Sequence, residues 1–204
     1  MFVQVIQGPV SDVEAVRATV DRGLREPEPG AEGWLGCTYG VTDDGMLIAV
    51  VRFESAEAAQ RNAARPEQQA WWQQMESHFT GPVVVRDCPD VMVLGRGGSD
   101  EAKFVQVIQG RVRDRERARA LAEQANQSAG LISALRPDFI GATRAIDGEG
   151  YLTETMAFTC EADAREGERK EPPPELKQLV DDEMSMLEDT RFLDLRQPWF
   201  ASRR

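Results

Sequence analysis

The same seven residues occur twice in this chain of 204 residues. Residues 2–8 and residues 104–110 both have the sequence Phe-Val-Gln-Val-Ile-Gln-Gly. The correspondence continues downstream, because Trp-Leu-Gly-Cys-Thr at 34–38 matches Phe-Ile-Gly-Ala-Thr at 139–143. A repeat of about one hundred residues is the size of a domain and too long for a solenoid unit. The chain is therefore an internal duplication.

Both copies carry the same order of strand and helix signals. In the first copy, two alternating strands flank Asp44-Gly45, a dipeptide typical of tight hairpin turns. Pro66 suits the first turn of the helix that follows this hairpin. The expected elements of the first copy are a strand at 2–7, a helix with a capping box at Ser11 and Glu14, strands at 35–41 and 46–54, a helix at 66–79 and a strand at 83–86. Those of the second copy are a strand from 104, a helix capped by Asp114, strands at 140–146 and 151–159, a helix at 175–187 and a strand at 191–195, with one short extra strand at 91–94 between the copies.

This βαββαβ order is the ferredoxin-like plan, present twice. A ferredoxin-like sheet has helices on one face only, and a second sheet packed against the open face would cover it. We therefore predict an α+β fold in which tandem ferredoxin-like repeats form, within one chain, the kind of α+β barrel that usually requires a dimer. The expected ranges are 1–95 for the first repeat, 96–103 for a Gly-rich linker and 104–204 for the second repeat.

The composition narrows the classes of partner. The chain has 35 Asp and Glu against 24 Lys and Arg, which argues against nucleic acid because phosphate binding needs a concentrated basic surface. Its three cysteines have no metal-ligand or disulfide spacing, so we expect reduced thiols, a cytoplasmic protein and no metal. No apolar run is long enough to cross a membrane. The sequence also lacks a phosphate-binding or dinucleotide-binding glycine motif, so no cofactor is expected.

The opening strands, the two hairpins and the segment Val-Val-Arg-Phe-Glu-Ser-Ala-Glu-Ala at 50–58 resemble a known group. They are similar to the dimeric α+β barrel superfamily, within it to the antibiotic-biosynthesis-monooxygenase-like domains, over nearly the whole chain. The resemblance implies a pocket between sheet and helices or inside the barrel. Members include cofactor-independent oxygenases of polyketide quinols, heme-degrading enzymes, isomerases and stress proteins, so the fold alone does not define the reaction.

A heme-degrading member would need an axial histidine on its second helix. The only histidine of this chain is His78. Alignment on the family pattern puts Trp72 at the axial position and His78 near the end of the helix. We therefore keep heme binding as a minor alternative and expect His78 to interact with the helix C-terminus. His78 nevertheless stays a candidate catalytic residue, because it is the only histidine of the chain.

Four residues are candidates for ligand binding within the repeats. Trp71 and Trp72 are adjacent on the second helix, so they cannot both face the core, and one is expected to line a cavity, groove or subunit contact. Gln4 and Gln106 occupy the same position in the two apolar opening strands. A buried amide needs hydrogen-bond partners. These two glutamines either bond to each other or to backbone, or they hold a ligand carbonyl or hydroxyl group.

The remaining candidates lie on the hairpin strands. Glu154 occupies the position of Ala49 in the first copy, and burial would raise the pKa of such a carboxyl group and suit it to act as a base. Arg144 and Arg52 are its possible partners, and the alternatives to a catalytic or ligand-binding role are a simple ion pair or an exposed strand face. Tyr39 could handle a substrate proton or serve only in packing.

The sequence thus predicts a protein that binds a small apolar or aromatic molecule. If it is an enzyme, the resemblance implies cofactor-free oxygenation of a quinol-like substrate, in which the substrate anion reduces oxygen inside a dry cavity. The alternative is a non-catalytic binding or stress-related protein of the same fold. We expect a monomer with a pseudo-dimeric structure, or a homodimer.

Overall fold

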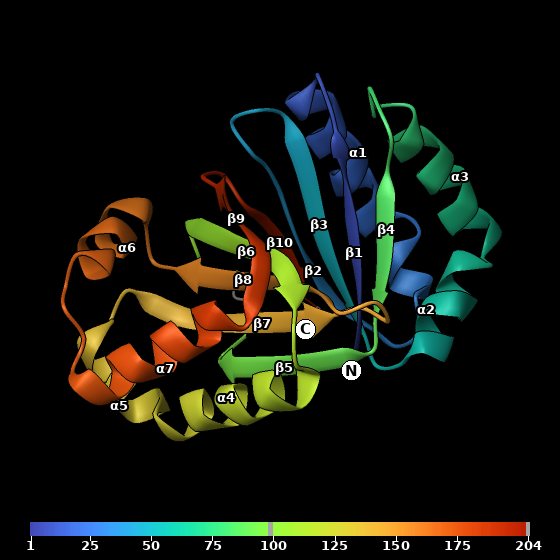
Figure 1. Ribbon diagram of the computed structural model, residues 1–204. Coiled ribbons are helices and arrows are strands. Elements are labelled where there is room, and N and C mark those ends of the chain that lie inside the picture. Colours follow the sequence, from blue (N-terminus) through green and yellow to red (C-terminus); the bar gives the residue numbers. More distant parts are fainter. Residues whose placement is uncertain (98–99, 203–204) are drawn as a thin grey trace. The chain divides into compact units, whose positions relative to one another are not determined.

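The computed structural model describes residues 1–97 and 100–202, and its chain forms two compact units (Figure 1). Unit 1 comprises Met1–Pro89 together with the segment that starts at Trp199, and unit 2 comprises Asp90–Pro198. Each unit contains a five-stranded antiparallel sheet. Gly98 and Ser99, within the expected linker, lie outside the described residues.

Unit 1 has the sheet order β10-β2-β3-β1-β4. Its four strands from the first repeat have the order of the ferredoxin-like plan. The helices α1, α2 and α3 lie on one side of this sheet (Figure 1). The elements are β1 (Phe2–Pro9), α1 (Val13–Arg25), the 3-10 helix η1 (Glu28–Gly30), β2 (Trp34–Val41), β3 (Met46–Phe53), α2 (Ala56–Ala63), α3 (Pro66–Glu76), β4 (Val84–Cys88) and β10 (Trp199–Ser202).

Local signals account for most of these boundaries, with one correction. The side chain of Asp12, and not of Ser11, caps α1 by accepting a hydrogen bond from the backbone N–H of Ala15 at 2.9 Å. The hairpin turns as expected through Gly45, whose φ of +82° lies in the left-handed region that favours glycine. The short helix α2 was not expected from the sequence, although Ser55 caps it with the same geometry.

Alternation along the strands decides which side chains face the helices. Gln4 and Ile6 of β1 lie on the helix side of the sheet, and their partners on β3 are Val51 and Ala49. Tyr39 of β2 is paired with Ala49 and shares this face. Together these residues form the sheet side of the space enclosed by α1, α2 and α3.

Unit 2 repeats the plan with the sheet order β5-β7-β8-β6-β9. The predicted βαββαβ order is confirmed in both repeats, with extra short helices in each. In unit 2 the unexpected ones are α5 and α6. The elements are β5 (Asp90–Gly95), β6 (Phe104–Val112), α4 (Arg115–Gln127), α5 (Ala129–Leu135), β7 (Phe139–Ile146), β8 (Tyr151–Phe158), α6 (Glu161–Glu168), α7 (Pro174–Ser185) and β9 (Leu187–Leu195).

The outermost strand beside each hairpin comes from the other repeat. β5 ends the first repeat along the chain but pairs with β7 of unit 2. β10 lies at the end of the second repeat but pairs with β2 of unit 1. The extra strand expected at 91–94 is therefore present, and β10 was not expected. As a result, the boundaries of the compact units differ from the boundaries of the sequence repeats.

No helix in residues 1–97 and 100–202 combines the length and the apolar character that crossing a bilayer requires.

Candidate functional site: a cavity between the sheet and the helices of unit 1

Unit 1 contains a cavity of about 480 Å³ between its sheet and its three helices. This volume falls within the range of roughly 300–1,000 Å³ that is typical of small-molecule sites. The lining residues come from β1, β2, β3 and β4 on one side and from α1, α2, α3 and the η1 segment on the other. The cavity therefore occupies the place where a helix layer would otherwise pack tightly on the sheet.

Aromatic rings of α3 and the turn after it form one wall of the cavity. The ring centroids of Trp71 and Trp72 are 6.4 Å apart, and those of Trp72 and Phe79 are 6.3 Å apart, both pairs being tilted. The indole of Trp71 is fixed by a hydrogen bond from its Nε1 to the backbone oxygen of Thr19 at 2.8 Å. Both tryptophans thus line the cavity, although they diverge around the helix.

The sheet side of the cavity is apolar apart from the hydroxyl group of Tyr39 and the amide group of Gln4. Ile6, Leu47, Ala49 and Val51 contribute methyl and methylene groups, and Tyr39 lies among them. Burial raises the pKa of the Tyr39 hydroxyl well above its usual value, and the neighbouring Cys37 adds to this effect. Tyr39 is therefore suited to donate a hydrogen bond and poorly suited to act as a base near neutral pH.

A small number of polar side chains also line the cavity. Gln4 Nε2 donates to Asp87 Oδ1 at 2.9 Å across the β1–β4 pair. Asn62 of α2 is buried, and its Oδ1 accepts a hydrogen bond from Arg65 Nη1 at 3.1 Å. The same Arg65 nitrogen donates to the backbone oxygen of Pro27 at 2.7 Å, which ties the η1 segment to α2.

The charged residues of the lining are acidic. Glu28 and Glu76 belong to it, and no lysine, arginine or histidine does among the residues that the structure describes. Residues 1–89 as a whole contain 13 Asp and Glu against 7 Arg and no Lys. The potential within the cavity therefore disfavours an anion.

The equivalent space in unit 2 is filled by charged side chains. Arg144 is paired with Glu154 in the register, as Tyr39 is with Ala49 in unit 1. Arg144 Nη2 donates to Glu154 Oε2 at 3.0 Å and to Glu183 Oε1 at 2.9 Å. We call Arg144, Glu154 and Glu183 the buried triad.

The electrostatics of the buried triad follow from its burial. Burial opposes the charge of Arg144, but the two carboxylates together raise the pKa of its guanidinium above its usual value. Burial also raises the pKa of Glu183, and Arg144 opposes that shift. Arg144 Nε and Nη1 have no partner within the described residues. Both oxygens of the Glu154 carboxylate accept hydrogen bonds from Arg144 Nη2, so this carboxylate is engaged in an ion pair.

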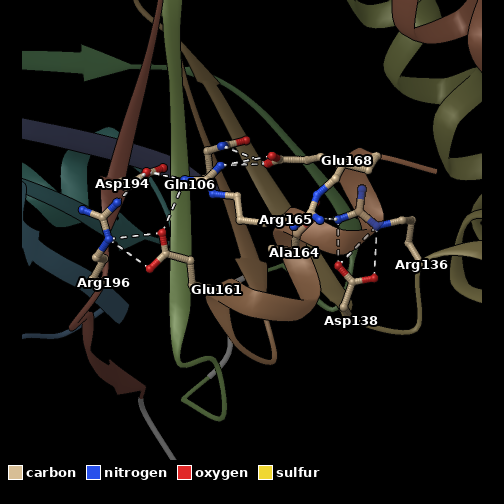
Figure 2. A network of polar contacts seen from close by, with 10 residues as sticks. Gln106, Arg136, Asp138, Glu161, Ala164, Arg165, Glu168, Asp194 and Arg196 are labelled. Carbon is tan, nitrogen blue, oxygen red and sulfur yellow. Dashed lines mark hydrogen bonds and ion pairs between the residues drawn. The ribbon is translucent and has the colours of Figure 1, made fainter. Parts of the chain in front are cut away.

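A second network closes the region around Gln106 (Figure 2). Gln106 Nε2 donates to Glu168 Oε1 of α6 at 3.3 Å. Its partner in the register, Asp194, is held by Arg165 and by Arg196. Arg136 pairs with Asp138 at 2.7 Å close to the same helix. These residues occupy the part of unit 2 that corresponds to Gln4 and Asp87 in unit 1.

A pocket in the described part of unit 2 is much smaller. It has a volume of about 20 Å³ and lies between α4, α5 and the strands β5 and β7, which is enough for about one water molecule. The two copies of the duplicated module thus differ in the volume of the cavity that they offer to a ligand.

The structure places the sequence candidates in three groups. Gln4, Tyr39, Trp71 and Trp72 meet in the cavity of unit 1. Gln106, Glu154 and Arg144 belong to the networks of unit 2. Arg52 and His78 are not among the described residues that line the cavity.

Arg52 and His78 each bond to a threonine. Arg52 Nη1 donates to Thr38 Oγ1 at 3.2 Å, and by strand alternation both lie on the sheet face that points away from the helices. His78 Nε2 lies 2.9 Å from Thr19 Oγ1 and so connects the end of α3 to α1. The heme alternative needs a histidine facing the cavity, and this geometry does not provide one.

Asp87, Asn62 and Glu183 contribute to these arrangements and were missed by reasoning from the sequence. Asp87 is the one that strand register could have revealed, because it lies opposite Gln4 when β4 pairs with β1. In the described part of the chain, no three His, Cys, Asp or Glu side chains gather in a way that could hold a metal ion.

The fold of the two units matches that of solved tandem proteins along the full chain. A candidate monooxygenase of Lactobacillus acidophilus NCFM is similar with a TM-score of 0.74 and 13% identity, over 98% of this chain and 95% of that one. A candidate monooxygenase of Fusobacterium nucleatum gives a TM-score of 0.75 and 9% identity, over 99% and 94%. An anthrone oxidase-like protein gives a TM-score of 0.69 and 12% identity, over 98% of this chain and 92% of that one.

A ferredoxin-fold protein from Listeria monocytogenes that is related to antibiotic biosynthesis monooxygenases also matches, with a TM-score of 0.51 and 9% identity over 95% of this chain and 94% of that one. No family model and no curated protein matches the sequence. This chain thus has the tandem α+β fold of antibiotic-biosynthesis-monooxygenase-like proteins, as predicted from the repeats. Identities this low establish the fold and leave the reaction to the site.

Proposed function

We propose that unit 1 binds one small, flat aromatic molecule in its cavity and oxygenates it without a cofactor. The observation that carries this proposal is the cavity of about 480 Å³ itself, with a tilted aromatic wall facing an apolar sheet. Flat ligands bury a large apolar area against aromatic side chains, and a few polar groups suffice to orient them. Full-length similarity in fold to candidate monooxygenases and to an anthrone oxidase-like protein supports the reaction class.

The chemistry needs little from the protein. A phenol whose ring C–H becomes a carbonyl takes up one O2, retains one oxygen atom as the new carbonyl oxygen and releases the other as water. The substrate itself supplies the electrons, and its hydroxyl hydrogen and its ring hydrogen leave in that water. The cavity contributes a dry environment, and Tyr39, with its raised pKa, contributes a hydrogen bond to the ring oxygen.

A second candidate function is binding without turnover. It is favoured by the position of the bases proposed from the sequence, because Glu154 lies in the buried triad of unit 2 and His78 bonds to Thr19. In this case the cavity would store or sense an aromatic molecule.

Titration with naphthols and anthrones, combined with oxygen uptake, tests both functions. We expect saturable binding, with one O2 consumed per quinone formed if the protein is an oxygenase and no oxygen uptake above buffer if it only binds. Ala49→Leu adds three carbon atoms inside the cavity and should weaken binding about tenfold, equivalent to about 1.4 kcal/mol. Ala120→Leu, the same change at an exposed position of α4, is the matched control. Absence of binding by the wild-type protein would refute both functions.

A further inference from the structure

The polar groups of the cavity determine which charge and which hydrogen-bonding groups its ligand can have. This inference rests on the proposed function, since it assumes that an aromatic molecule enters the cavity. Gln4 is the key residue for this inference, because it lines the cavity from strand β1 and has a hydrogen-bond partner in Asp87.

Asp87 determines which way the Gln4 amide is oriented. A carboxylate has acceptors only, so the Gln4 group that lies 2.9 Å from Asp87 Oδ1 must be the NH2 group. The amide oxygen is thereby turned away from Asp87, and it accepts no hydrogen bond from the described residues. A ligand that meets this oxygen gains a hydrogen bond only if it brings a donor.

The charged residues of the lining act in the same direction. Glu28 and Glu76 are the ionisable acids of the lining, and the described lining contains no cationic side chain. A buried carboxylate without a cation loses its hydration and gains no partner. An anionic ligand is therefore disfavoured, whereas a neutral hydroxyl group matches the acceptor of Gln4.

The duplicated copy supplies a natural contrast. Gln106 has the same place in an identical heptapeptide, and its register partner is likewise an aspartate, Asp194. In unit 2, however, Arg165 and Arg196 hold this aspartate, and Gln106 donates to Glu168 (Figure 2). In unit 1 the glutamine lines a cavity and bonds to the aspartate, whereas in unit 2 arginines hold the aspartate and the glutamine bonds to Glu168.

We propose that Gln4, held in orientation by Asp87, accepts a hydrogen bond from a hydroxyl group of an uncharged aromatic ligand, and that the cavity discriminates against carboxylated analogues. Gln4 is a specificity-determining residue in this scheme, and Asp87 is a positioning residue that acts through it.

Three ligands that share one ring system test the proposal by calorimetry at about pH 7: naphthol, methoxynaphthalene and naphthoate. Naphthol should bind the wild-type protein about threefold to tenfold more tightly than methoxynaphthalene, the gain of one hydrogen bond. It should bind at least about tenfold more tightly than naphthoate.

The variants use the duplication as an internal control. Gln4→Leu should abolish the preference for naphthol over methoxynaphthalene, while Gln106→Leu removes the same amide from unit 2 and should preserve that preference. Asp87→Asn changes an exposed side chain and lets the Gln4 amide turn over, so it should reduce the preference without affecting folding.

Two results would overturn the inference while leaving the proposed function intact. The first is equal affinity of the wild-type protein for naphthol and methoxynaphthalene, or tight binding of naphthoate. The second is an equal effect of Gln4→Leu and Gln106→Leu on the preference. Binding of none of the three ligands would overturn the proposed function together with this inference.

Discussion

Gly23 of α1 lies directly against the indole of Trp71, so closely that a Cβ atom at position 23 would overlap with the ring nitrogen. The same ring nitrogen donates to the backbone oxygen of Thr19, one helical turn before Gly23. The glycine therefore allows α3 to approach α1 and sets the position of one wall of the cavity.

We expect Gly23→Ala to displace Trp71 and break its hydrogen bond. Overpacking of this kind typically costs about 1–3 kcal/mol, and it should outweigh the gain of up to about 1 kcal/mol that alanine brings to a helix. Chemical denaturation would show the lower stability, and ligand affinity would fall with it. Gly130→Ala on α5 meets no atom within 4 Å and should be neutral or stabilising. Equal stability of the two variants would contradict this account of the helix contact.

The buried triad makes a separate prediction about stability. Arg144→Met leaves Glu154 and Glu183 buried and without a cation, so the free energy of unfolding should fall by about 3–5 kcal/mol. Replacing all three residues by methionine removes both the charges and their desolvation cost, and should restore most of the loss. A triple variant as unstable as Arg144→Met would show that the triad is a net source of stability.

The buried hydroxyl group of Tyr39 should make the free energy of unfolding depend on pH in the alkaline range. Its pKa in the folded protein is raised by burial above the usual value of about 10, so the folded state retains this proton longer than the unfolded state does. The corresponding stability is present below about pH 10 and is lost as the pH rises toward the folded-state pKa. Denaturation between about pH 9 and 11 should show a shallower decline for Tyr39→Phe than for the wild-type protein. Identical slopes would mean that the hydroxyl group is not buried.

His78 should matter for stability and not for binding. His78→Ala removes the hydrogen bond to Thr19, and the free energy of unfolding should fall by about 0.5–1.5 kcal/mol. Affinity for naphthol should stay within about twofold of the wild-type value, since His78 does not belong to the described lining of the cavity. A loss of affinity for naphthol without a loss of stability would show that His78 takes part in ligand binding.

The sequence predicted the fold well because the duplication could be detected without any structural knowledge. Once the two opening strands were aligned, the hairpin predicted in each copy confirmed the alignment of the other. The turn at Gly45 was predicted because tight hairpin turns need a residue with positive φ, which glycine adopts readily. The short helices and β10 were missed, because a strand of four residues that pairs with a distant segment leaves no periodic signal of its own.

The site was predictable only in part. Gln4, Tyr39 and the two tryptophans were singled out from the sequence, and they meet in one cavity. Glu154 shares its partner Arg144 with Glu183, which lies on a helix nearly thirty residues further along the chain. Nothing in the sequence around either residue indicates that Glu183 pairs with Arg144.

The exchange of the outermost strands has a consequence for how the protein is made. Unit 2 is a continuous stretch of 109 residues, 90–198, inserted between β4 and β10 of unit 1. At a synthesis rate of about 5–20 residues per second, β10 leaves the ribosome roughly 5 to 20 seconds after β4. Unit 1 is therefore begun first and completed last, and its nascent sheet has an open edge at β2 throughout the synthesis of unit 2.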